Sequence, residues 1–301
     1  MYSSKTNRIT KLAAVAMVLI LAVTGFAAAC QPVAETPAEG KIGVIVSILP
    51  LADFVENIGG ERVDVTVMVP PGSSPHTFAP TPGQLLEVSK AKLFVKVGSG
   101  LGFERAWMDR IRAQNEEMLI IDGSVGIELI HGGCPCCAPG DLDPHIWLSP
   151  LNARIMVQNI SEGLISIAPE YADFFAENTR RYLAELNDLH IYIREQLDGF
   201  VNRYFLIYHP AFGYLARDHN LTQLAIERDG KEPTPRVIME SIDLAVKHNL
   251  SYVFVSAQFP LRPAETIARS INGQTALIDP LPRYYILSMR NVADLLAREM
   301  E

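Results

Sequence analysis

Short apolar runs and longer helical patterns alternate along the chain from residue 42 onward. Apolar, β-rich runs predict strands at 42–49, 63–69, 93–97, 118–122, 204–208, 252–256 and 275–279. Apolar positions at helical spacing predict helices between them, at 84–90, 104–113, 236–248, 263–271 and 289–300. Short strands that alternate with helices indicate α/β structure with mostly parallel sheets.

One longer helical pattern separates the two groups of strands. Beyond Pro169 the apolar positions recur mostly at steps of three and four, at Tyr171, Phe174, Phe175, Tyr182, Leu186, Leu189, Ile193 and Leu197. This single stripe predicts one helix, which Pro169 can open and Gly199 can end. About 30 residues at ~1.5 Å each give a rod of ~45 Å, which suits a bridge between domains. We therefore predict two α/β lobes, at 41–168 and 200–301, joined by one long helix at 169–199.

The first 29 residues have the pattern of an export signal. Three basic residues precede an apolar run at 12–23, and small residues follow it. A basic start, a short apolar segment and small residues before a cleavage point are typical of a secretory signal peptide. The alternative is one membrane-spanning helix, because 12–29 just reaches the ~18 residues that spanning requires.

The signal-like segment ends in AAAC, at Cys30. This ending resembles a bacterial lipobox, although Ala27 stands where leucine is usual. The resemblance implies that Cys30 carries a lipid anchor, and the polar, Pro-containing stretch at 31–40 is typical of a flexible tether. We therefore expect the folded part to lie outside the cytoplasm, anchored to a membrane.

Composition and charge exclude two classes of protein. The chain has 301 residues, of which 49% are apolar and 20% are charged, so it is globular rather than disordered. Its formal net charge of −8 becomes −11 when the three basic residues of 1–29 are removed with the signal peptide. There is no basic stripe, so we expect no nucleic-acid partner.

Three histidines and one aspartate follow predicted strands or lie in proline-rich loops. His76 and His145 fall in the first predicted lobe, and His209 and Asp279 in the second. Ligands of open α/β sheets bind beyond the carboxyl ends of the strands, so a cleft between lobes could gather all four. Three imidazoles with a carboxylate or water suit Zn²⁺, and more oxygen ligands would favour Mn²⁺.

Spacing alone leaves an ordinary structural role open for each of these four residues. Lone histidines in loops are commonly surface groups, and an aspartate before proline, such as Asp279, is commonly a turn. The chain has no HExxH motif and no pair of CxxC motifs. His190, His219 and His248 are expected to be structural or surface groups, and Tyr284 and Tyr285 to pack as aromatics or line the cleft.

Five segments together resemble the substrate-binding proteins of the zinc/manganese ABC importers (cluster A-I, ZnuA-like). The segments are SPHTFAPTPGQ, DPHIWLSPLNA, YHPAFGYLARDHNL, RDGKEPTP and IDPLPR, and the resemblance covers about residues 41–300. It implies two α/β lobes joined by a single long helix, with a metal site in the cleft between the lobes.

The resemblance also implies ligands, metal and partners. His76, His145 and His209 would bind the metal, with Asp279 or water in the fourth position. His209 is the zinc-type residue at the third position, where manganese-type members usually carry Glu. The implied function is capture of Zn²⁺, or less readily Mn²⁺, by a non-enzymatic, monomeric lipoprotein that delivers it to an ABC importer permease with its ATPase.

Two departures from the family pattern stand out. Ala79 occupies a position that is commonly Glu, and HGGCPCCAPGD replaces the His- and acid-rich loop that often precedes DPH. Three interpretations of that loop stay open: an accessory metal site, a disulfide, or an inert surface loop. The accessory site would use one or two of the thiolates together with His131, and the residues concerned are His131, Cys134, Cys136 and Cys137.

Two other functions remain as alternatives. Three histidines with an open fourth position also describe a catalytic zinc site, so a zinc-dependent hydrolase is one of them. The other is a surface adhesin, because some members of the resembled family are described as adhesins.

Overall fold

A computed structural model describes residues 40–131, 142–227 and 231–300. Four parallel strands form the first sheet, in the order β2-β1-β3-β4. The strands are β1 (Ile42–Val46), β2 (Val63–Val67), β3 (Leu93–Lys96) and β4 (Leu119–Asp122). The central strands β1 and β3 are runs of apolar residues, as expected of strands covered on both faces. The chain order reverses between them, which places a ligand-binding switch point at their carboxyl ends.

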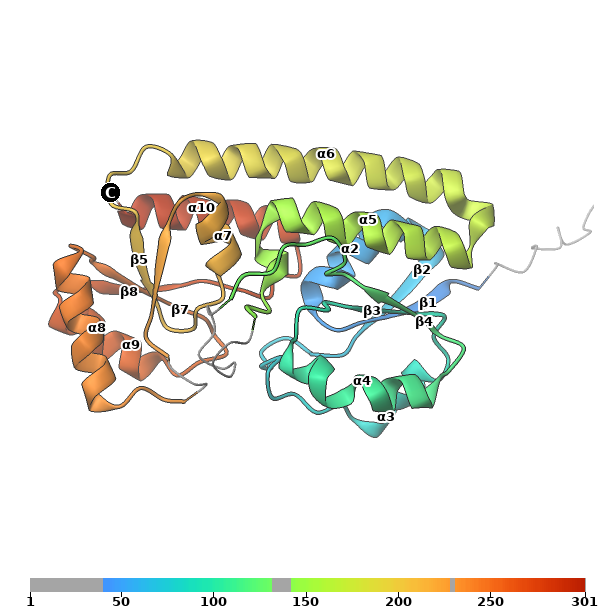
Figure 1. Ribbon diagram of the computed structural model, residues 1–301, viewed down its shortest axis with the longest axis horizontal. Helices are drawn as coiled ribbons and strands as arrows, with labels where there is room; N and C mark the ends of the chain where they lie inside the picture. Colours follow the sequence, from blue (N-terminus) through green and yellow to red (C-terminus); the bar gives the residue numbers. More distant parts are fainter. Residues whose placement is uncertain (1–39, 132–141, 228–230, 301) are drawn as a thin grey trace, which may run out of the picture. The chain divides into compact units, whose positions relative to one another are not determined.

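Helices cover both faces of this first sheet (Figure 1). One pair, α2 and α5, lies on the face toward the long helix, and the other pair, α3 and α4, lies on the opposite face. The bounds are α2 (Leu49–Gly59), α3 (Pro82–Val88), α4 (Gly102–Gln114) and α5 (Pro150–Ile167). Pro50, Pro82 and Pro150 stand in the first turns of three of them, where no intrahelical N–H bond is lost.

The second sheet repeats the strand order of the first. It has four parallel strands in the order β6-β5-β7-β8. The strands are β5 (Tyr204–Ile207), β6 (Thr222–Ala225), β7 (Tyr252–Val255) and β8 (Gln274–Leu277). The helices are α7 (Gly213–Asp218), α8 (Pro235–Lys247), α9 (Leu261–Ser270) and α10 (Tyr285–Met300). Successive residues of β5 belong to opposite faces: Phe205 joins the core shared with α10, and Leu206 joins the core under α8 and α9.

The predicted long helix is present as α6 (Ala172–Leu197) and connects the two lobes. Its 26 residues give a rod of about 39 Å. Figure 1 shows it running over α5 of the first lobe and α10 of the second, and both helices contact it. The fold prediction is thereby confirmed. The helix begins three residues later than the stripe suggests, because Pro169–Tyr171 form a 3₁₀ turn after α5 ends at Ile167.

Apolar side chains join the lobes near the start of α10. Tyr285 is fully buried, and its ring meets that of Phe54 edge-on at 4.9 Å between centroids. Its hydroxyl donates to the carbonyl of Trp147 at 2.6 Å, and the Trp147 indole donates to the carbonyl of Pro280 at 2.7 Å. The second lobe is therefore hydrogen-bonded to the residue that lies two positions beyond His145.

Helices capable of spanning a membrane are not found among the described residues. The predicted signal peptide, Cys30 and the tether lie outside those residues, and their assignment stays a prediction.

Candidate metal centre

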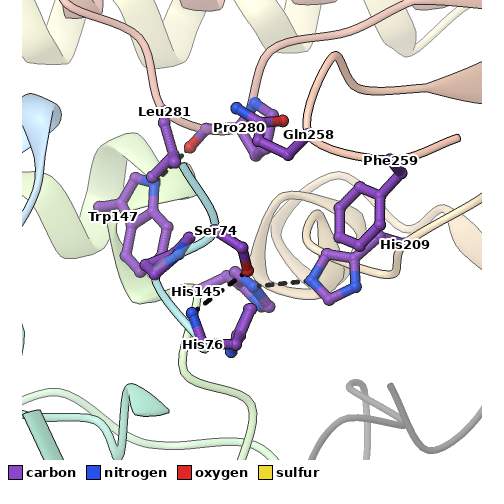
Figure 2. A pocket seen from close by; sticks show the side chains of 10 residues that line it. Ser74, His76, His145, Trp147, His209, Gln258, Phe259, Pro280 and Leu281 are labelled. Atoms are coloured by element: carbon purple, nitrogen blue, oxygen red, sulfur yellow. Dashed lines mark hydrogen bonds between the residues drawn. The ribbon is translucent and has the colours of Figure 1, made fainter. Parts of the chain in front are cut away.

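Three histidines from three separate segments meet between the lobes. His76 lies in the loop after β2, His145 opens the 3₁₀ turn before α5, and His209 lies two residues beyond β5. One ligand nitrogen from each ring lies within 4.8 Å of the others. The ring centroids are 5.1–5.3 Å apart, and the Nε2 atoms of His145 and His209 are 3.2 Å apart. Figure 2 shows the three rings converging on one point.

Asp143 fixes the orientation of the His145 ring. One oxygen, Oδ1, lies 2.8 Å from His145 Nδ1 and also accepts the backbone N–H of His145 at 2.9 Å. The bond assigns the ring proton to Nδ1 and leaves the lone pair of Nε2 facing the other histidines. Asp143 is itself held by the second lobe, because the hydroxyl of Tyr214 donates to its carbonyl at 2.9 Å.

Glu227 plays the same part for His209. Its Oε2 lies 2.5 Å from His209 Nδ1, and both side chains are buried. Glu227 follows β6, the neighbour of β5, so two adjacent parallel strands deliver the acid and the imidazole to the same edge of the sheet. Phe259 stacks on the outer face of the His209 ring at 4.6 Å between centroids. The second ring nitrogen of His209, Nε2, points into the cluster, 3.2 Å from Nε2 of His145.

Burial favours the neutral form of His76 and of His209. The pKa of His76 lies well below its usual value, first because of burial and then because of the nearby His145 and His209. Burial also lowers the pKa of His209, against the opposing effect of the Glu227 hydrogen bond. Neutral rings offer lone pairs to a metal ion at neutral pH.

The charge of the site fits a divalent cation. Asp143 and Glu227 are 0% and 4% exposed, and counted formally these two acids give the site a charge of −2. The second oxygen of Asp143, Oδ2, is buried and accepts no hydrogen bond from the described residues. Burying uncompensated charge is costly, so an ion of charge +2 bound by the rings would stabilise this arrangement.

The lining of the site is otherwise mainly apolar. Side chains and prolines from both lobes surround the rings, namely Pro75, Trp147, Phe259, Pro280 and Leu281, with Ser74 and Gln258 as polar members (Figure 2). His76 is the least buried of the three histidines. A low-dielectric lining strengthens the interaction between the ion and the carboxylates.

The structure brings three of the four predicted ligands together and leaves Asp279 outside the group. Asp279 is exposed, and its Oδ1 accepts the backbone N–H of Leu281 at 2.9 Å, as in a turn. The strand before it ends at Leu277, two residues earlier than predicted. Pro280 and Leu281, rather than Asp279, reach the histidine pocket.

The predicted accessory loop falls mostly outside the described residues. Cys134, Cys136 and Cys137 all lie there, and so does the lipidation candidate Cys30. His131 is described: it is exposed and pairs as an antiparallel bridge with Leu142. That bridge brings the two ends of the loop together immediately before Asp143.

The remaining candidate residues do not join the donor group. His190 and His219 lie ring to ring at 5.3 Å, and His248 stacks on Tyr204 at 3.8 Å. Tyr285 packs in the core between the lobes, whereas Tyr284 is exposed.

Sequence reasoning missed Asp143 and Glu227, the two acids that orient the rings. Asp143 stands in the quoted DPHIW segment two residues before a predicted ligand, and such a carboxylate commonly pairs with the ligand's second nitrogen. Glu227 could have been found only by predicting β6, whose sequence TQLA carries a weak strand signal.

Comparisons with known proteins agree with this geometry. The family described as "Zinc-uptake complex component A periplasmic" (ZnuA) matches residues 44–299. This chain belongs to the ZnuA family. The family is one of transport binding proteins, so the hydrolase alternative is not kept and the chain is not an enzyme.

Several relatives share most of their length with this member of the ZnuA family. The high-affinity zinc uptake system protein ZnuA of Bacillus subtilis is 26% identical over 254 residues, which are 80% of this chain and 79% of that protein. A putative metal-binding protein of Chlamydia muridarum is 31% identical over 238 residues, covering 79% and 84%.

Two solved structures superpose closely on this chain. A crystal structure of ZnuA has a TM-score of 0.83 at 35% identity and covers 87% of this chain and 100% of that one. A Mn-bound periplasmic metal binding protein of Candidatus Liberibacter asiaticus has a TM-score of 0.77 at 20% identity, covering 87% and 100%. At that identity the second comparison shows the fold alone.

We predict that Glu227→Gln weakens binding of a divalent metal, with Zn²⁺ as the probe, by about 10–100-fold. The amide still accepts the His209 Nδ1–H bond, but the site loses half of its negative charge. The dissociation constant measured by competition with a chelator checks this. The exposed Glu61→Gln should bind as the unchanged protein does; equal affinity of both variants would contradict a role for the Glu227 charge.

Proposed function

We propose that this chain captures Zn²⁺ outside the cytoplasm on His76, His145 and His209 and delivers it to an ABC importer permease with its ATPase. The observation that carries the proposal is the donor set: three imidazoles that converge between the lobes, two of them held by buried carboxylates. Zinc binds readily to three imidazoles in a four-coordinate site. The names of its relatives, including the zinc uptake protein of Bacillus subtilis, support zinc as the cargo.

We favour zinc over manganese because all three gathered donors are nitrogen. Manganese prefers oxygen ligands, and the two nearby carboxylates already contact the rings of His145 and His209. A manganese site would need those oxygens to leave the rings that they orient. Relatives of the same fold do hold manganese, as the Candidatus Liberibacter asiaticus protein does.

For the fourth ligand we favour water over Asp279. Asp279 is exposed and is engaged with Leu281, whereas the Oε1 atom of Gln258 is buried at the histidine pocket with no hydrogen-bond donor among the described residues. A metal-bound water could donate a hydrogen bond to that amide oxygen, which would satisfy both groups.

Delivery requires that the ion be released when the permease engages the protein. His76 and His145 belong to the first lobe and His209 to the second, so separating the lobes would remove one of three ligands from the other two. We propose that the permease uses this split site, and that the chain acts as a monomer held at the membrane through Cys30. The accessory metal loop and the adhesin alternative stay predictions.

We predict that His145→Ala abolishes the one tight zinc site. Removing a direct ligand should cost more than the roughly 10–100-fold typical of losing a ligand's hydrogen-bond partner. Isothermal titration of folded protein, with folding checked by circular dichroism, measures it. His248→Ala, which removes a ring outside the donor group, is the control. Retained stoichiometry at the tight site in His145→Ala would overturn the proposed function.

Zinc affinity should resist mild acid. The pKa values of His76 and His209 lie below the ordinary 6.5, so protons begin to compete with the metal only below that pH. We expect affinity to stay nearly constant from pH 8 to about 6.5 and to fall steeply at lower pH. Chelator competition across this range measures it. A decline centred at or above pH 6.5 would show rings that titrate as exposed histidines do.

We predict that Asp279→Asn changes zinc affinity by less than about threefold, because an exposed, solvent-screened charge contributes little. The amide keeps an oxygen that accepts the Leu281 N–H bond, so the turn should survive. The same titration measures it, with His145→Ala as the positive control. A loss as large as that of His145→Ala would instead identify Asp279 as the fourth ligand.

A further inference from the structure

The loop between β3 and the first turn of α4 touches the backbones of two ligand segments. The carbonyl of Pro75, the residue before His76, accepts the backbone N–H of Phe103 at 2.9 Å. The carbonyl of Pro144, the residue before His145, accepts the hydroxyl of Ser99 at 2.5 Å. One short segment, residues 97–104, therefore holds the peptide that immediately precedes each of these ligands. We call this segment the bracket.

Contact with His76 is closer still at the start of α4. A Cβ atom on Gly102 would lie 2.4 Å from the carbonyl oxygen of His76 and 2.9 Å from its Cα. Both are backbone atoms, which cannot move aside as the end of a flexible side chain can. Only glycine lets the helix approach the ligand loop this closely.

Glu104 links the two ends of the bracket by hydrogen bonds. It lies in the first turn of α4, is 5% exposed, and its two oxygens accept the backbone N–H groups of Val97 at 2.6 Å and Gly98 at 2.9 Å. These donors are the first two residues after β3. One buried carboxylate thus ties the end of a central strand to the start of a helix, across the turn that carries Ser99.

The turn at residues 97–101 needs the hydrogen bonds of Glu104 because two of its glycines have positive φ angles. Gly98 and Gly100 have φ angles of +89° and +94°, a region that favours glycine and leaves the chain with many alternative conformations. Two hydrogen bonds, one to each oxygen of the buried Glu104 side chain, select one of these conformations. Without them, Ser99 and Phe103 would lose their fixed positions relative to the two prolines.

We propose that Glu104 is a positioning residue for the metal site, acting through the bracket on the loops of His76 and His145. This proposal rests on the proposed function, because it concerns how tightly the three histidines hold their ion. Glu104 touches neither the rings nor the ion. Its effect is to limit how far two of the three ligands can move before the ion binds, and such supporting contacts decide how precisely a site is formed.

The test compares Glu104→Gln with a matched core variant of the same helix, Ile111→Ala. A glutamine can accept only one of the two N–H bonds and turns an N–H donor toward the other. Ile111 is fully buried in the core and belongs to neither ligand loop nor the bracket. Both variants should lower the melting temperature of the zinc-free protein, but only Glu104→Gln should disturb the site.

Two readouts separate positioning from stability. We expect Glu104→Gln to weaken zinc binding by about 10–100-fold in chelator competition. It should also alter the d–d absorption of bound Co²⁺, which reports coordination geometry. Ile111→Ala should keep the affinity and the spectrum of the unchanged protein. If Glu104→Gln keeps both as well, the proposal is overturned.

Ser99→Ala is a second variant that keeps the proposal testable if Glu104→Gln does not fold. It removes only the hydroxyl that holds Pro144, so we expect correct folding, a several-fold loss of zinc affinity and an altered Co²⁺ spectrum. If Glu104→Gln does not fold, this variant decides, and unchanged affinity in it overturns the proposal. Failure of the unchanged protein itself to bind zinc would instead contradict the proposed function.

Discussion

The burial of two carboxylates between the lobes is the constraint on which the rest of the site depends. Burying acids such as Asp143 and Glu227 is costly unless they are hydrogen-bonded and any charge on them is balanced. The groups that satisfy them are the Nδ1 atoms of His145 and His209. Because those nitrogens are occupied, the remaining lone pairs face inward. The two acid–imidazole hydrogen bonds thus lower the cost of burying the acids and also direct Nε2 of each ring toward the metal position. A divalent ion bound there would balance the formal negative charge of the two acids.

Several contacts between the lobes lie close to the site. Each acid–imidazole pair belongs to one lobe, yet the cluster forms only where the lobes meet. The Trp147 indole, two residues from His145, is bonded to Pro280 of the second lobe, and Tyr285 returns a bond to Trp147. The long helix α6 contacts helices of both lobes along its length. The distance between His145 and His209 is therefore set by core packing as well as by the metal.

Much of the architecture could be predicted from the sequence because strong periodic signals specify it. The stripe from Tyr171 to Leu197 predicted a linking helix, and its members from Phe175 onward are buried as expected. The histidines were recognisable because their loops follow strands and carry prolines. For Asp279 the turn interpretation also has support, because its exposed carboxylate accepts the backbone N–H of Leu281, and its role as the fourth ligand stays a prediction.

Other parts of the site could not be predicted because the decisive contacts are non-local. Strand β6 is four residues long and contains Thr222 and Gln223, so little in its sequence distinguishes it from a loop. Its place in the sheet comes from pairing with β5, and that pairing alone brings Glu227 to His209. Glu104 is likewise invisible from the sequence, because its partners, two backbone N–H groups, have no residue signature.

The pairing of His209 with Glu227 limits which type of residue can stand at position 209. In the resembled manganese-type members, the third position usually carries Glu. Here a glutamate at 209 would put a carboxylate beside the buried Glu227 and raise the formal negative charge of the site from two to three. Like charges at that distance in a poorly solvated interior repel strongly, and one of them would take up a proton. The buried Glu227 therefore disfavours a carboxylate at position 209 and favours a nitrogen donor there.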